Sequence, residues 1–355
     1  MNKNFLNYEY FKNINLEDPF FDSLKKDYKE FENWFQKKQE EKAYYFENEK
    51  GIQAFLYLKV EEEKLLETEP TLPKKRRIKI GTLKINQHGT KLGERFIKKA
   101  IDHAVVNNIF ELYVTVFPRH QPLIELLERY GFRIAAYKTT ENGKENVMVK
   151  DLSSVTGSIT ADYPLVNTTN KSVYLLSIFP EYHTSLFPDS ILNNETYDVV
   201  KDVAHTNSIH KIYISSAPNS ANLKPGDTLV IYRTSDKKGH AEYRSVATSI
   251  CVVDEIQAKR SFADYDDFSS YCKKYSVFSE KELNDIYKKN RFTVIKMTYN
   301  LAMKKKLIRK TLADDCGLDR RDRWTIIRIN DEQFKKIIEL GGAHENFIIH
   351  QTGVC

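Results

Sequence analysis

The sequence predicts a mixed α+β protein of two domains, a central sheet with helices followed by a small β-barrel. The chain has 355 residues and 41% hydrophobic content, enough for two domains that each bury a core. Helical and strand-like patterns alternate up to residue 150, whereas closely spaced strand-like runs dominate after residue 171. Residues 151–170 are rich in Ser, Thr and Asn, which is typical of a linker. We therefore predict domains at residues 1–150 and 171–355.

The first domain is predicted to begin with an amphipathic helix. Apolar residues recur at helical spacing from Phe21 to Phe35, after a proline that favours a helix start. Three strands are then predicted at residues 43–46, 52–60 and 77–85. A helix, a strand, a short helix closed by Gly131 and a last strand are predicted at residues 96–105, 111–117, 122–132 and 144–150.

The second domain is predicted to be mostly β. Runs of β-branched and aromatic residues, separated by turn residues, predict five strands at residues 173–180, 210–217, 227–234, 243–256 and 291–300. Two helical stretches are predicted at residues 266–287 and 330–341. Antiparallel strands at such close spacing favour a small barrel.

Charge is distributed unevenly along the chain. Residues 1–70 hold 11 Lys, no Arg and 16 acidic residues, a net charge of −5, whereas the whole chain is +6. The remaining residues therefore carry +11, with basic clusters at 74–77, 304–306 and 320–323. Such clusters attract phosphate-rich partners, and they are equally typical of a solvated lysine-rich surface.

The sequence indicates a cytoplasmic protein with no membrane partner. The first 20 residues have no cleavage site and no uninterrupted apolar segment, and no apolar run approaches the length of a membrane span. The four cysteines are far apart and form no C-x-x-C pair. We expect buried or idle thiols and no metal site.

The loop after residue 85 is the first candidate site. It holds Gly89 and Gly93 and connects a predicted strand to a predicted helix. The first N–H groups of a helix have no intrahelical partner and lie at the positive end of the helix dipole, which favours phosphate. Two glycines are equally typical of any tight turn, so the flanking elements must distinguish the two interpretations.

The order of elements around this loop resembles the core of the GNAT acyltransferase superfamily over about residues 18–150. The resemblance implies acetyl-CoA as cofactor, with its pantetheine arm in a gap between two central strands. It implies a pyrophosphate cradle made by the loop residues His88, Gly89, Thr90, Lys91, Leu92 and Gly93. By the same resemblance, the backbone amides around Leu83, Lys84 and Ile85 would be the oxyanion donors. His88 and Lys91 depart from the usual pattern, which has Arg or Gln and Gly there.

The chemistry of acetyl transfer requires that an amine lose a proton before it attacks the thioester. Glu94, Glu111 and His120 are candidate bases, although Glu94 and Glu111 are equally typical of exposed carboxylates. The family often has a tyrosine acid at the position that Leu127 occupies here. Tyr130 and Tyr113 are candidate substitutes, and both are also typical packed aromatics.

The second half resembles the PUA-like group in its ASCH and EVE branch over about residues 171–341, without the G-x-K-x-x-E-x-R signature of many ASCH domains. The resemblance implies binding of RNA or a modified base. Cations and hydroxyl or aromatic groups suited to phosphates and bases are then the candidate contacts: Lys211, Ser215, Tyr232, Arg233, Thr234, Tyr243, Arg244, Lys273, Lys274 and Tyr275. Each is equally typical of a surface charge or a packed ring.

Two classes of function follow. In the first, the chain is an acetyl-CoA-dependent N-acetyltransferase whose second domain captures RNA, including tRNA or aminoacyl-tRNA, for acylation. In the second, a degenerate and inactive acetyltransferase domain accompanies a module that binds modified nucleic acid in a regulatory or defence setting. Protein acetylation with the barrel as a targeting device is a third reading. The acetyl acceptor and the oligomeric state stay open.

Overall fold

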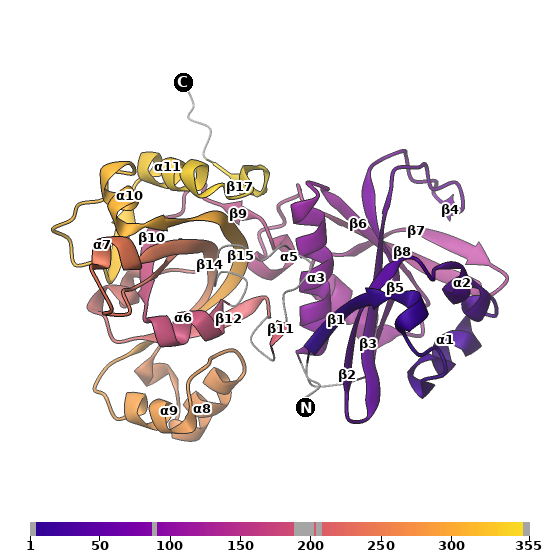
Figure 1. Cartoon of the computed structure of the whole chain (residues 1–355), viewed down its shortest axis with the longest axis horizontal. Helices are drawn as coiled ribbons and strands as arrows, with labels where there is room; N and C mark the ends of the chain where they lie inside the picture. The colour runs from indigo at the N-terminus through magenta and orange to yellow at the C-terminus, as the bar shows by residue number, and fades with distance from the viewer. Residues whose placement is uncertain (1–4, 87–90, 188–201, 204–207, 351–355) are drawn as a thin grey trace. The chain divides into compact units, whose positions relative to one another are not determined.

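The computed structural model describes residues 5–86, 91–187, 202–203 and 208–350 (Figure 1). The chain forms two compact units, Met1–Thr156 with Asn194–His205 and Gly157–Asn193 with Thr206–Cys355. The change of unit after Thr156 lies inside the segment predicted as a linker, yet that segment also contains ordered structure. It forms α5 (Ile159–Asp162) and β9 (Val166–Asn167), and Tyr163 between them is fully buried.

The first unit is built on one nine-stranded sheet. Its strands lie in the order β11 (Asp202–Val203), β1 (Phe5–Tyr10), β2 (Lys42–Asn48), β3 (Gly51–Glu61), β5 (Arg77–Ile85), β6 (Glu111–Val116), β8 (Gly143–Asp151), β7 (Arg133–Thr140), β4 (Thr68–Glu69). Neighbouring strands are antiparallel except β5 and β6, which are parallel because the helix α3 connects them. The sequence analysis did not predict β1, β4, β7 or β11.

Helices cover both faces of this sheet. The helices α3 (Leu92–Val106) and α4 (Gln121–Arg129) pack together on one face, and α1 (Asp22–Asp27) and α2 (Phe31–Lys37) lie on the other (Figure 1). The predicted single helix over residues 21–35 is wrong, because the backbone at Tyr28 is extended (φ −130°, ψ 105°) and ends α1. The short 3-10 helices η1 (Phe11–Asn13) and η2 (Pro19–Phe21) complete an aromatic core, in which Phe11, Phe35 and Phe55 are buried.

The second unit has a six-stranded sheet. Its order is β12 (His210–Ser215), β15 (Thr293–Ile308), β14 (Val246–Ala258), β13 (Thr228–Arg233), β10 (Val173–Ile178), β16 (Ile326–Ile329), with β10 and β13 parallel. Among the described residues the two outer strands do not pair, so the sheet is not a closed barrel. The 3-10 helix η6 (Pro218–Asn222) contacts both β15 and β16, and Asn219 donates to the Ile326 carbonyl at 3.3 Å. The mixed α+β class is therefore confirmed, whereas barrel closure is wrong for the described part.

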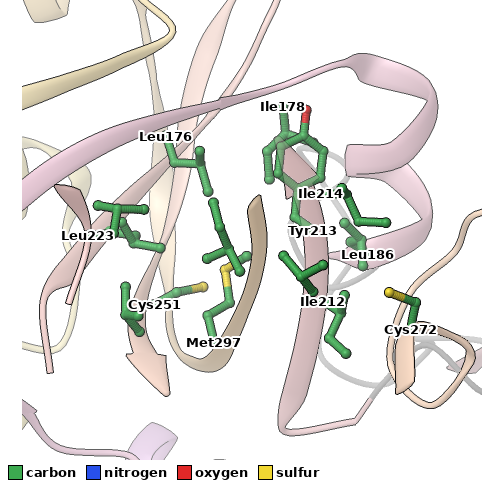
Figure 2. Close-up of a cluster of buried hydrophobic side chains, with 14 of the residues drawn as sticks. Leu176, Ile178, Leu186, Ile212, Tyr213, Ile214, Leu223, Cys251, Cys272 and Met297 are labelled. Carbon is green, nitrogen blue, oxygen red and sulfur yellow. The ribbon is translucent and has the colours of Figure 1, made fainter. Parts of the chain in front are cut away.

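Buried side chains from β10, β12, β14, β15 and α6 (Pro180–Leu186) form the core of this unit (Figure 2). The predicted helix over 266–287 is two helices, α8 (Tyr265–Lys273) and α9 (Glu280–Tyr287), because Ser279 and Glu282 form a capping box that starts the second.

The prediction of buried thiols is confirmed for the three described cysteines, all unbridged. The remaining elements are α7 (Ala241–Arg244), η7 (Lys259–Ser261), α10 (Arg309–Asp314), α11 (Asp331–Gly341), η8 (Glu345–Phe347) and β17 (Ile348–Ile349), which pairs with β9.

No helix in the described ranges is long and apolar enough to cross a membrane.

Candidate functional site

The central feature of the first unit is a divergence between the two parallel strands. The β5–β6 ladder has three pairs, the last being Ile80 with Val114, and β5 then continues for five residues without a described partner on β6. A β-bulge lies at the start of the divergence: Leu58 pairs with Ile80 and Tyr57 pairs with Thr82, so Gly81 is an extra residue. A Cβ atom at Gly81 would lie 2.7 Å from Cδ1 of the Tyr57 ring, which explains the glycine.

Among the described residues, the part of β5 beyond Ile80 has no partner strand on the side that faces β6. Beyond Ile80, β5 is hydrogen-bonded to β3 on one side, and its other side faces the divergence. Antiparallel pairing directs alternate N–H groups toward each side of a strand. The three residues predicted to supply oxyanion donors, Leu83, Lys84 and Ile85, lie in this stretch. Their catalytic role stays a prediction.

The predicted phosphate loop is only partly described. His88, Gly89 and Thr90 lie outside the described residues. Lys91 is the N-cap of α3, and Leu92 and Gly93 form its first turn. A Cβ at Gly93 would lie 2.8 Å from Cδ2 of Leu126, so this glycine also lets α3 and α4 approach each other.

Lys91 brings a positive charge to the start of α3. Burial lowers the pKa of its ammonium to about 8, opposed by the Glu94 carboxylate nearby. The ammonium is therefore mostly charged at neutral pH. Glu94, a predicted base, is buried in the first helical turn, where a carboxylate is favoured by the helix dipole.

The opposite face of the sheet carries an ion-pair cluster next to α1. His120, a predicted base, is the N-cap of α4, and its Nε2 lies 3.0 Å from Oδ2 of Asp27. The Arg119 guanidinium lies 2.8 Å from the other carboxylate oxygen of Asp27 and 4.1 Å from the centre of the Phe117 ring. The structure thus gives His120 a carboxylate partner that orients its ring.

A second pair on this face was missed by the sequence analysis. The Tyr28 hydroxyl donates to Oε1 of Glu145 at 2.5 Å, and Glu145 is only 3% exposed. Burial, then the Glu145 carboxylate, raises the pKa of Tyr28 well above its usual range. The pair spans 117 residues and leaves no local signature. The one available signal was Glu145 itself, a carboxylate in register with Val147 and Val149 on the inward side of a strand.

The other predicted catalytic groups have structural partners away from the divergence. Glu111 lies at the opposite end of β6 and forms ion pairs with the Lys75 ammonium at 2.5 Å and with Arg77. Tyr113 donates to Glu61. Leu127 and Tyr130 are 0% and 2% exposed, so both pack in the core. The arrangement accounts for Glu111 as the buried partner of two cations.

In the second unit, several predicted contacts gather where the sheet strands end. Ile178, Arg233, Val246 and Ile308 are neighbours across four strands. Arg309 lies 4.1 Å above the Trp324 ring, which contacts the Tyr232 ring edge-on at 5.3 Å between centres. We call Arg233, Thr234, Arg309, Trp324 and Tyr243 the strand-end cluster. Tyr232 is 1% exposed and is therefore too buried to stack on a base, whereas Tyr243 is 57% exposed.

The remaining predicted contacts are elsewhere. Lys211 and Ser215 are buried in β12. Tyr275 packs against His210 with ring centres 5.3 Å apart, and Lys273 pairs with Glu280. Lys274 is exposed beside them. Arg244 forms a two-point ion pair with Asp236 at 2.6 and 2.5 Å. Of the predicted regions, only the strand-end cluster combines an exposed aromatic ring, that of Tyr243, with half-buried guanidinium groups, those of Arg233 and Arg309.

Comparisons with known proteins give similarities to solved structures alone. No family model and no curated protein matches the chain. A Zymomonas mobilis ASCH structure matches with 12% identity and a TM-score of 0.34 over 48% of this chain and 95% of that one. Arabidopsis thaliana Naa50, in complex with the bisubstrate analogue CoA-Ac-MVNAL, matches with 18% identity and a TM-score of 0.25 over 31% and 71%. A GNAT-family acetyltransferase from Streptococcus pneumoniae matches with 16% identity and a TM-score of 0.25 over 35% and 75%.

Proposed function

We propose that the first unit is an acetyl-CoA-dependent N-acetyltransferase and that the second unit binds RNA or another nucleic acid, tRNA and aminoacyl-tRNA included. The observation that carries the acetyltransferase proposal is the divergence of β5 and β6 at Gly81, because it opens the centre of the sheet next to the start of α3. Backbone N–H groups of β5 that face the divergence suit the thioester oxygen of acetyl-CoA, and the N-terminus of α3 suits its phosphate groups.

The residues fit the coenzyme as follows. The amides of Leu83 to Ile85 that face the divergence would donate to the thioester oxygen, where negative charge develops in the transition state. The start of α3 and the Lys91 ammonium would hold the pyrophosphate. Acetyl-CoA supplies the activated acyl group. The α1–α2 face, with Asp27, Tyr28 and His120, would receive the amine.

Calorimetry of the full chain with acetyl-CoA tests this proposal. We expect micromolar binding, which Lys91→Ala weakens about tenfold, or ~1.4 kcal/mol. Lys99→Ala is the matched control, since Lys99 lies in the same helix and its ammonium contacts the Tyr44 ring instead. Acetyl transfer is then measured with spermidine, a lysine peptide and an aminoacyl-tRNA. Absence of coenzyme binding in the folded wild type would refute the acetyltransferase.

The nucleic-acid proposal is supported by the strand-end cluster and by Phe179, which is 56% exposed directly after β10. Exposed rings next to guanidinium groups suit stacked bases and phosphates. Fluorescence anisotropy with a tRNA and a single-stranded RNA should show affinity that falls linearly with the logarithm of salt concentration. Tyr243→Ala should weaken binding, whereas Tyr137→Ala, an exposed tyrosine of the first unit, should not. Equal affinities in the two variants would exclude this surface.

One observation favours the alternative of a degenerate acetyltransferase. Leu127 is buried at the position where the resemblance places a tyrosine acid. A thiol pKa of about 8.5 makes the thiolate an adequate leaving group, so a missing acid slows transfer without preventing it. RNA binding in a chain that binds no coenzyme would establish the alternative.

A further inference from the structure

We infer that Glu145, held by Tyr28, binds the protonated amino group of the acceptor and takes its proton, so that the acceptor is a primary amine that arrives as an ammonium ion. The inference rests on the proposed acetyltransferase function and assigns the base of that reaction.

Glu145 lies beside the divergence. The β6–β8 ladder ends with Val116 paired to Asn146, so Glu145 is the next residue on β8, opposite the point where β6 gives way to Phe117. The Tyr28 ring, which donates to Glu145, packs on Phe117 at 5.3 Å between centres. Both contacts place Glu145 on the face of the sheet that α1 and α2 cover, whereas α3 covers the other face (Figure 1).

The carboxylate is buried without a counter-ion. Among the described residues, no Lys, Arg or His nitrogen lies within 4 Å of Glu145, and its hydrogen-bond donor is the neutral Tyr28 hydroxyl. Two other buried carboxylates are compensated: Glu111 has the Lys75 and Arg77 cations, and Asp227 accepts from the backbone N–H groups of Ser172 and Lys224 at 3.1 and 2.8 Å. Among the described residues, neither a cation nor a backbone N–H group is bonded to the Glu145 carboxylate. Because burial of an uncompensated charge is costly, this difference indicates that a cationic group of a ligand binds there.

Tyr28 orients this carboxylate. Its raised pKa keeps the hydroxyl protonated, so it donates to one oxygen and leaves the other for the ammonium. The extended backbone at Tyr28 interrupts the helix and carries the ring to the sheet. Tyr28 is thus a positioning residue, and Glu145 is the group that touches the acceptor.

The reaction step balances as follows. The ammonium gives one proton to the Glu145 carboxylate, and the free amine attacks the thioester carbon. A C–N bond forms and the C–S bond breaks. The departing thiolate takes the second proton of the attacking nitrogen, and Glu145 releases its proton to solvent.

The test compares the variant Glu145→Gln with the control Glu30→Gln. Glu30 is an exposed residue whose carboxylate accepts a hydrogen bond from the Asn142 side chain at 2.9 Å. The Gln side-chain oxygen can still accept the hydrogen bond from Tyr28, and the substitution removes the buried charge. If the Glu145 carboxylate serves to bind a cationic ligand, the protein should fold without it. Without ligand, we expect Glu145→Gln to melt at or above the wild-type temperature. Millimolar n-butylamine hydrochloride should raise the melting temperature of the wild type and of Glu30→Gln, but not that of Glu145→Gln.

Two activity measurements separate this inference from the proposed function. Acetyl-CoA affinity should be unchanged in Glu145→Gln, and kcat with the best acceptor of the panel should fall at least about 100-fold with an unchanged KM for acetyl-CoA. Tyr28→Phe should retain intermediate activity. A wild type that binds n-butylamine but no coenzyme would refute the acetyltransferase alone. Three results with Glu145→Gln would each overturn the inference: a melting temperature several degrees below that of the wild type, a retained response to n-butylamine, or a wild-type kcat. If kcat falls in His120→Gln and not in Glu145→Gln, the base is His120.

Discussion

Gly81→Ala is the most direct perturbation of the strand divergence. Its Cβ would lie 2.7 Å from Cδ1 and 3.1 Å from Cε1 of Tyr57. That ring cannot move aside, because it is 2% exposed, its hydroxyl donates to Glu41, and the Phe11 ring packs on it at 5.2 Å between centres. Overpacking of this kind costs about 1–3 kcal/mol. The first unit should therefore lose roughly 2–10 °C of melting temperature.

Gly93→Ala is the matched control. Its Cβ would also approach another atom closely, at 2.8 Å, but that atom is the terminal methyl Cδ2 of the half-buried Leu126, which can rotate away. Alanine is favoured over glycine in a helix by up to about 1 kcal/mol, which offsets the contact. We expect Gly93→Ala to be neutral within about 0.5 kcal/mol.

The assay is urea unfolding followed by the fluorescence of Trp34, whose ring lies 5.7 Å from that of Tyr57, in a Trp324→Phe background. The coenzyme affinity of folded Gly81→Ala should also fall, since its β5 strand can no longer bulge. Equal stability of the two variants, or unchanged coenzyme affinity in Gly81→Ala, would refute the claim that the bulge forms the site.

Three further predictions test single groups. Glu111→Gln should lower the free energy of unfolding by about 3–5 kcal/mol, because it leaves the buried Arg77 uncompensated, and it should leave kcat of the folded enzyme unchanged. Calorimetric unfolding and steady-state kinetics measure the two effects. A lost kcat would restore Glu111 as the base. Burial, then Arg233 and Lys306, lowers the pKa of His183 to about 3, so its contribution to stability is present above pH 6.5 and is lost as pH falls. In a Trp34→Phe background, where Trp324 reports unfolding, the free energy of unfolding should fall by about 2 kcal/mol more between pH 7 and pH 5 with His183 present than with His183→Gln. Identical slopes would contradict this. Coenzyme affinity should weaken as pH rises through about 8, where the Lys91 ammonium loses its charge. Lys91→Arg should abolish this pH dependence, because the guanidinium stays charged. A pH dependence that persists in Lys91→Arg would show that another group causes it.

Local sequence patterns were sufficient for part of the fold. The helix α3 and the strands β5, β6 and β8 follow from periodicity, because each buries one face or lies inside the sheet. The break at Tyr28 could not be predicted from the apolar spacing that continues across it. Tertiary contacts decide it, since Tyr28 bonds a residue on β8. The strand β11 has only two residues, too few for a periodic pattern, and it pairs with the distant strand β1.

The candidate site divides in the same way. The β5 residues and Lys91 were found from chain order and from the resemblance, because they lie close together in sequence. Glu145 and Asp27 were missed, since their partners are far along the chain. Tyr232 and Lys211 were chosen for chemical type, and burial removes them from any surface. Side-chain type predicts what a residue can do, whereas burial decides whether a macromolecule can reach it.

The pairing of β11 with β1 has a consequence for how the protein can be divided. The chain passes between its two units three times, after residues 156, 193 and 205. A fragment that ends near residue 156 would leave the N–H and C=O groups of Phe5 and Leu6 uncovered at a sheet edge, which is a template for self-association. A fragment that begins there would carry a strand that belongs to the other unit. No single cut therefore divides the chain into its two compact units.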